Sequence, residues 1–105
     1  MAGDRFKVIS KAVTTAGAAE AISDTDLWVS WILIEWDETN SGSNVYRGDA
    51  DVDNTYPTIT STKSFSWSSA GDNLNLADIY LDVDSSGDSV WVTYGKSQTQ
   101  AAEDN

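Results

Sequence analysis

The chain has 105 residues and contains neither cysteine nor histidine, which excludes disulfides, thiolate chemistry and a Ser-His-Asp triad. Its formal net charge is −11, from 17 acidic and 6 basic residues, and this charge disfavours binding to nucleic acid or to an anionic membrane. A surface of this kind stays soluble at high salt and is typical of a halophilic origin. The length predicts a single domain with a small core.

The first predicted element lies in a short basic N-terminal arm, about residues 1–11. Partial alternation of apolar and polar residues over 6–13 predicts a strand. Three of the six bases, Arg5, Lys7 and Lys11, fall in this arm. One hypothesis is that they dock on an acidic protein surface such as a capsid shell. The alternative is that they are scattered surface bases without a binding role.

The next predicted element is the strand "LWVSWILIEW", residues 27–36, which is rich in aromatic and β-branched residues. It carries apolar side chains on both of its faces, so both faces need cover. We predict that Trp31 points into the core together with seven aliphatic residues, Val29, Leu33, Ile79, Leu81, Val83, Val90 and Val92. The opposite face of the same strand is predicted to hold Trp28, Ile32, Ile34 and Trp36.

Three explanations account for the second apolar face of this strand. It is covered by the rest of the same chain, it is a subunit interface, or it is a platform on which sugars stack. We favour the interface, because large exposed apolar patches usually mark contact surfaces and aromatic residues are enriched there. The predicted subunit-interface residues are therefore Trp28, Ile32, Ile34 and Trp36.

Short predicted strands separated by turns continue along the rest of the chain. Turns are predicted at "DETNSGSN", at Gly48-Asp49 and at "SSGD", and the sole proline, Pro57, belongs at a strand edge or start. Alternation marks strands in "KSFSW", "IYLDV" and "SVWVTYG", and a polar tail follows over about residues 96–105. The predicted fold class is all-β, a single small antiparallel β-sandwich that is jelly-roll-like, over residues 1–105.

Acidic side chains provide the remaining candidate sites. The Asp-rich turn "DVDSSGD", with Asp82, Asp84 and Asp88, resembles the start of a calcium loop, because Asp82, Asp84 and Ser86 stand at alternate positions before Gly87. The bidentate glutamate is absent and the context is a hairpin, so a turn is favoured. The tripeptide at 47–49, "RGD", is interpreted as a turn. Glu35 is the best candidate for a glycosidase carboxylate, but a small sandwich leaves little room for a cleft. We therefore predict no catalytic residue, no metal and no cofactor.

The order of these signals resembles a group of small virion structural proteins of tailed viruses, phage or haloarchaeal, of the capsid decoration or head-fibre type. The matching pieces are "LWVSWILIEW", "TNSGSNVYRGDADV", "TKSFSW" and "LNLADIYLDVDSSGDSVWVTYG", within about residues 12–95. The chain departs from the pattern at "DNTYPTITST", where these proteins usually have a Gly-rich or Pro-Gly loop.

The resemblance implies a non-enzymatic protein on the outer surface of the capsid. Its partners would be the major capsid protein and sister subunits, arranged as a homo-oligomer, a trimer, with no nucleic acid and no membrane. An alternative function is a carbohydrate- or receptor-binding module of a tail or head fibre, in which exposed tryptophans would contact a glycan.

Overall fold

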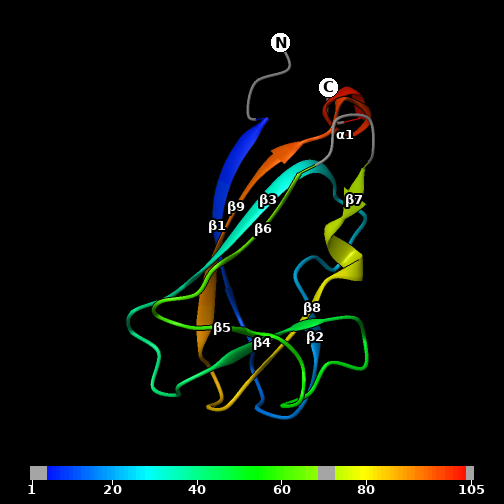
Figure 1. Ribbon diagram of the computed structural model, residues 1–105. Helices are drawn as coiled ribbons and strands as arrows, with labels where there is room; N and C mark the ends of the chain where they lie inside the picture. Colours follow the sequence, from blue (N-terminus) through cyan, green and yellow to red (C-terminus); the bar gives the residue numbers. More distant parts are fainter. Residues whose placement is uncertain (1–4, 69–72, 104–105) are drawn as a thin grey trace.

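The fold is an antiparallel β-sandwich, seen in a computed structural model that describes residues 5–68 and 73–103 (Figure 1). Within these residues the larger sheet has the order β1-β9-β3-β6, with β7 also pairing with β3, and the smaller sheet has the order β2-β8-β4-β5. The strands are β1 (Phe6–Ala12), β2 (Glu20–Ala21), β3 (Trp28–Trp36), β4 (Val45–Gly48), β5 (Thr58–Ile59), β6 (Phe65–Ser68), β7 (Leu74–Asn75), β8 (Tyr80–Val83) and β9 (Ser89–Lys96). The predicted all-β, sandwich-type fold class is confirmed.

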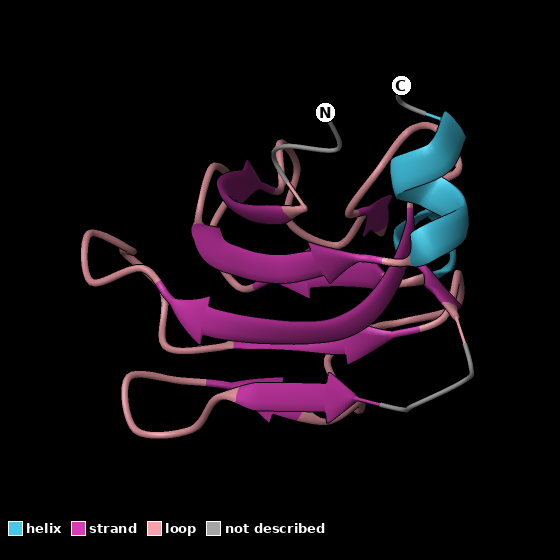
Figure 2. Cartoon of the chain, turned by 90° about the horizontal axis from the view of Figure 1, so that it is seen from above, coloured by secondary structure: helices cyan, strands magenta, loops and turns pink. Residues whose placement is uncertain are grey.

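Two short helical elements complete the described chain. A single 3₁₀ turn, η1 (Leu76–Asp78), precedes β8, and a short helix, α1 (Gln98–Glu103), follows β9. Figure 2 shows α1 at one end of the molecule, beside the ends of the strands. The beginning of β1 lies at the same end (Figure 1).

The core lies between the two sheets and consists of aliphatic side chains. The fully buried apolar residues are Val13, Val29, Ile32, Ile34, Val45, Ile59, Leu76, Leu81, Val90 and Val92. Burial confirms five residues of the predicted inward set, namely Val29, Leu81, Val83, Val90 and Val92, whereas Ile79 is half-buried against the core. Strand alternation over β8 and β9 therefore predicted the core correctly.

A β-bulge in β3 reverses which residues face the core. Val29 lies opposite Lys96 of β9, whereas Trp31 lies opposite the adjacent Gly95, so Ser30 is an additional residue in β3. An inserted residue shifts the alternation by one position and sends every later side chain to the other face.

The bulge overturns part of the face assignment made for β3. Ile32 and Ile34 are 1% and 0% exposed in the core, and they were expected on the opposite face. Trp31 and Leu33 are half-buried on the side of the sheet that faces away from the core, so the prediction that they point inward is wrong.

The segment after β9 is ordered by hydrogen bonds to the start of β3. The Ser97 hydroxyl accepts the Gln100 N–H at 3.1 Å, which caps the first turn of α1. The Trp28 N–H donates to Gln100 Oε1 at 3.0 Å, and the Ser97 N–H donates to the Trp28 carbonyl at 2.9 Å. The expected polar tail over 96–105 is thus a helix at Gln98–Glu103, with its last two residues outside the described ones.

The predicted basic arm is largely an edge strand of the larger sheet. Residues 6–11 lie in β1, which pairs with β9 throughout, and the Lys96 N–H donates to the Arg5 carbonyl at 2.7 Å. Residues 1–4 of the predicted arm lie outside the described residues.

Candidate functional site

The side of the larger sheet that faces away from the core combines large apolar and small polar side chains. Residues opposite one another in neighbouring strands point to the same side of a sheet. By this criterion the register places thirteen residues on this side, which we call the outer face: Phe6, Val8, Ser10, Ala12, Trp31, Leu33, Glu35, Ser66, Ser68, Ser89, Trp91, Thr93 and Gly95.

Large apolar side chains are exposed on the outer face. Phe6, Val8 and Trp91 are 63%, 52% and 45% exposed, and among the described residues they are the exposed large hydrophobic side chains. Trp31 and Leu33 lie half-buried beside them. An antiparallel sheet normally has polar residues on its solvated side. A group of exposed large apolar side chains in that position is typical of a contact surface.

Three rows of residues cross the outer face from β1 over β9 to β3. Named after their β9 members, they are the Gly95 row (Phe6, Gly95, Trp31), the Thr93 row (Val8, Thr93, Leu33) and the Trp91 row (Ser10, Trp91, Glu35). Because alternate residues of one strand are about 7 Å apart, the Gly95 and Trp91 rows lie equally far from the Thr93 row, on opposite sides of it.

The Gly95 row forms a hollow with aromatic walls. The indole of Trp31 lies over Gly95, where any Cβ would overlap the indole nitrogen. The rings of Phe6 and Trp31 are tilted at 37° with their centroids 5.9 Å apart. A depression of about 230 Å³ opens here, and Ser30, Arg5 and Lys96 also line it.

Charge is almost absent from the outer face, although the chain carries −11. Glu35 is the one charged residue of the thirteen, and it is exposed in the Trp91 row. Two of the chain's six bases, Arg5 and Lys96, border the hollow at the opposite end. Interface cores are depleted in charge and enriched in aromatic residues, which is the composition of the outer face.

The four residues predicted to form a subunit interface do not share one surface. Ile32 and Ile34 are core residues, so the interface prediction is wrong for both. Trp36 is half-buried and packs against the core, and Trp28 is half-buried where β3 meets the segment before α1. The bulge therefore places Trp31 and Leu33, rather than Ile32 and Ile34, on the outer face.

The three bases proposed for capsid docking lie along β1, in different surroundings. Arg5 is exposed and its guanidinium donates to the Lys96 carbonyl at 3.1 Å. Lys7 is half-buried on the core-facing side of the edge strand. Lys11 is ion-paired with Glu20 at 3.1 Å. Docking by these residues stays a prediction.

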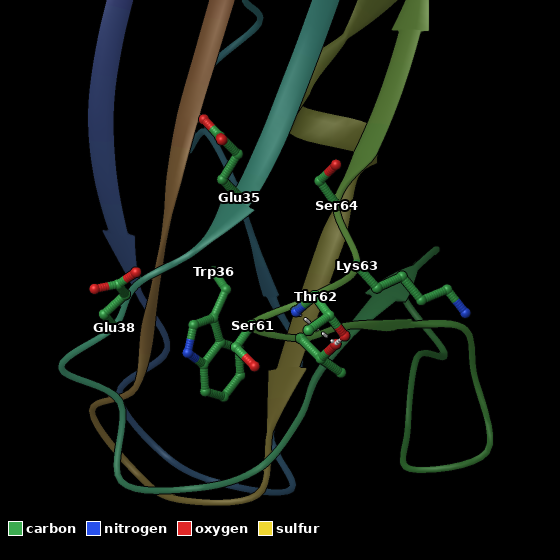
Figure 3. A pocket seen from close by; sticks show the side chains of 8 residues that line it. Glu35, Trp36, Glu38, Ser61, Thr62, Lys63 and Ser64 are labelled. Carbon is green, nitrogen blue, oxygen red and sulfur yellow. Dashed lines mark hydrogen bonds between the residues drawn. The ribbon is translucent and has the colours of Figure 1, made fainter.

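A second depression of about 290 Å³ lies between the end of β3 and the turn over residues 60–64 that connects β5 to β6, and its lining is mostly polar (Figure 3). Trp36 and Ser61 both line this trough, and the side chain of Lys63 points away from the indole. Glu35 and Glu38 also line the trough. An indole edge among hydroxyl and carboxylate groups is chemically suited to a sugar.

The carboxylates considered for calcium each have separate protein partners. Both oxygens of Asp88 accept backbone N–H groups, from Ser41 at 2.9 Å and Gly42 at 2.8 Å. Asp82 Oδ1 accepts the Gly17 N–H at 2.8 Å, and Asp84 accepts the Tyr46 hydroxyl at 2.7 Å. Within the described part of the chain, no group of three acidic side chains is placed to hold a metal ion. These carboxylates therefore stabilise turns.

The "RGD" tripeptide lies at the end of β4 and the start of the turn that follows it. The guanidinium of Arg47, in β4, lies 4.1 Å from the centroid of the Phe65 ring, in a cation–π contact between the two sheets. Asp49 begins the following turn and accepts the Asp51 N–H at 3.0 Å. The guanidinium of Arg47 therefore packs within the sandwich rather than extending from a loop.

Comparison of the chain with known protein families, curated proteins and solved structures found no match. In the described segments, no helix has the length and apolar character needed to cross a membrane.

Proposed function

We propose that this protein is a non-enzymatic structural module that binds other proteins through its outer face. The observation that carries the proposal is the exposure of Phe6, Val8 and Trp91 on a sheet face with one charge. Covering this face would remove apolar surface from water, which is the main driving force of protein association. A tryptophan at the centre of such a contact contributes about 2 kcal/mol or more.

We further propose that the module serves in a virion as a capsid decoration or stabilising protein on the outer capsid surface. The support is the resemblance in the order of the strand and turn motifs between residues 12 and 95. Its partners would be the major capsid protein and sister subunits. An apolar contact suits a salty medium, because salt screens surface ion pairs but leaves apolar burial intact.

Quantitative mass spectrometry of purified virus particles from the same source tests this role. The copy number of the chain is compared with that of the major capsid protein. Hundreds of copies per particle are expected for a capsid decoration protein. A handful of copies would contradict decoration and place the chain at a tail or vertex, and absence from the particle would contradict any virion role.

A carbohydrate- or receptor-binding module of a fibre is the second candidate function. The observation that favours it is the polar trough beside Trp36 (Figure 3). It predicts that the isolated protein binds a glycan on an array, that Trp36→Ala removes this binding, and that Trp91→Ala preserves it. An array without any bound glycan would contradict this function.

A further inference from the structure

We infer that the outer face binds the outer face of a second copy of this chain, in a twofold pair in which Trp91 of each copy enters the hollow at the Gly95 row of the other. The inference rests on the proposed function, because it names one occupant of the same surface. It replaces the implied trimer with a closed dimer, which is the commonest homo-oligomer.

The three rows determine the position and direction of the twofold axis. An axis that lies between the two faces, across the strands and along the Thr93 row, exchanges the Gly95 row with the Trp91 row and keeps the Thr93 row opposite itself. Both outer rows lie two residues from Thr93 along β9, at about equal distances from the axis. The same rotation therefore brings two Trp91 side chains opposite two hollows at once.

The two exchanged rows differ in shape in a complementary way. Trp91 projects from the face and is 45% exposed. No side chain projects from the centre of the opposite row, because Gly95 is covered by the indole of Trp31, whose ring centroid lies 5.9 Å from that of Phe6. The resulting depression of about 230 Å³ faces away from the core. An aromatic side chain that enters it would contact two further aromatic rings, an arrangement that favours edge or offset stacking.

The few charges of this surface are complementary under the same rotation. Glu35 lies in the Trp91 row, and Arg5 and Lys96 line the hollow at the Gly95 row. The rotation places Glu35 of each copy opposite Trp31 of the other copy, at the end of the face where these two bases lie. A pairing that kept the rows in the same order would instead leave Glu35 over the Trp91 row of the other copy, at the end of the face away from these bases.

The charge of the whole chain favours a second copy over a basic partner. A basic protein would be attracted to the surfaces that carry the acidic residues, which are numerous away from the outer face. Two copies of a chain with net charge −11 repel each other, and they approach best through a face with little charge. The nearly uncharged outer face meets that condition.

The size of the face indicates a reversible pair. Three strands with about seven residues each and β6 with four, about 4.8 Å apart and at about 3.3 Å per residue, cover roughly 400 Å² per copy as a flat area. The total of about 800 Å² is below the standard size of stable interfaces, so the pair should dissociate on dilution.

Sedimentation velocity over a concentration series tests the inference on the full chain. The expected mass rises from 11.4 kDa to twice that value with concentration. The rise should occur at lower concentration in high salt, because salt screens the repulsion between the copies. Trp91→Ala should weaken dimerisation at least tenfold. A chain that stays monomeric at millimolar concentration in high salt, or a dimer that survives Trp91→Ala unchanged, would overturn the inference.

A charge exchange tests the orientation of the pair. Glu35→Lys alone and Arg5→Glu alone should each weaken the dimer several-fold at low salt, and the double variant should recover it. Glu38→Lys is the matched control, since Glu38 is exposed in the loop after β3 and lies off the outer face. Circular dichroism verifies that each variant folds. A double variant that loses as much dimer affinity as the two single variants combined would overturn the pairing.

These outcomes are separate from those of the proposed function. A monomeric chain that is abundant in virus particles would refute the pair and leave the capsid role in place. A dimer that is absent from particles would refute the capsid role and leave the pair in place.

Discussion

The indole of Trp31 lies directly over Gly95 of the neighbouring strand, where a side chain would overlap it. This relationship joins the two strands at the centre of the larger sheet. It also explains why Gly95 is buried although it belongs to the outer face. The glycine is required by the close approach of a ring rather than by an unusual backbone conformation.

Replacing Gly95 by alanine should destabilise the fold. The added methyl group overlaps the indole nitrogen, so Trp31 must move or the strands must separate. Overpacking of this kind costs about 1–3 kcal/mol of unfolding free energy, which urea unfolding measures. The double variant Gly95→Ala/Trp31→Ala should lose less unfolding free energy than the two single variants lose in sum. Strict additivity would show that the ring does not constrain position 95.

The corrected face assignment of β3 can be tested by stability. Ile34 is 0% exposed, so Ile34→Ala should cost about 2–5 kcal/mol and Ile34→Val about 0.5–1.5 kcal/mol. Trp91 lies on the outer face, so Trp91→Ala should change the stability of the monomer by about 0.5 kcal/mol or less. Denaturant unfolding at dilute protein concentration measures all three. Equal losses for Ile34→Ala and Trp91→Ala would contradict the assignment.

Asn75 is a buried polar residue that connects two loops to the sheet. Its Oδ1 accepts the N–H groups of Leu27 and Ala77, both at 3.0 Å, and its Nδ2 donates to Asp26 at 2.9 Å. Asn75→Ala leaves the two N–H donors without this acceptor and should cost about 1–3 kcal/mol in thermal or urea unfolding. Asn54→Ala, at an exposed position, is the control and should be neutral. A neutral Asn75→Ala would show that water replaces the amide.

Stability should fall on acidification. The Thr39 N–H, followed by the hydroxyls of Thr39 and Ser89, lowers the pKa of Asp37. The Thr14 N–H, followed by Lys11, lowers the pKa of Glu20.

A carboxyl group whose pKa is lowered by folding stabilises the fold fully above its unfolded pKa of about 4, and this contribution is lost as the pH falls through the folded value. Melting temperatures measured from pH 6 to pH 2 should therefore fall less steeply for Asp37→Asn than for the parent. Parallel curves would rule out this contribution of Asp37.

Calcium should have no effect on stability. Asp82, Asp84 and Asp88 bind separate donors in the protein and do not converge on one point. Thermal melts with millimolar calcium and with a chelator should therefore coincide, at an ionic strength matched with a monovalent salt. A calcium-specific increase in melting temperature would show that these carboxylates rearrange around the ion.

The sequence predicted the positions of the strands better than it predicted which side of each strand faces the core. Alternation over β8 and β9 identified the buried valines and Leu81, because those strands are regular. The same rule failed after Ser30, where a single inserted residue exchanges the two faces of β3. Nothing in "LWVSWILIEW" except its one serine marks the position of the bulge. Apolar residues on both sides of the strand made either assignment equally consistent with burial.

The outer face escaped prediction because its residues come from four separate segments of the chain. Phe6 and Val8 alternate with lysines in the sequence, and that pattern indicated only a strand. Their proximity to Trp31 arises from the pairing of β1 and β3 with β9, which local sequence does not specify. The helix at the C-terminal end had a local signal, since "SQTQ" has the form of a capping box.

The lysines of the edge strand β1 limit how far this chain can aggregate. Within the described residues β1 pairs only with β9, so alternate backbone N–H and C=O groups along its other side point outward. Such an edge is a template for another strand. Lys7 and Lys11 place charge on the core-facing side of this edge, where an added strand would have to pack. Inward-pointing lysines of this kind oppose the growth of fibres, so the protein should reach high concentration in brine without gelling.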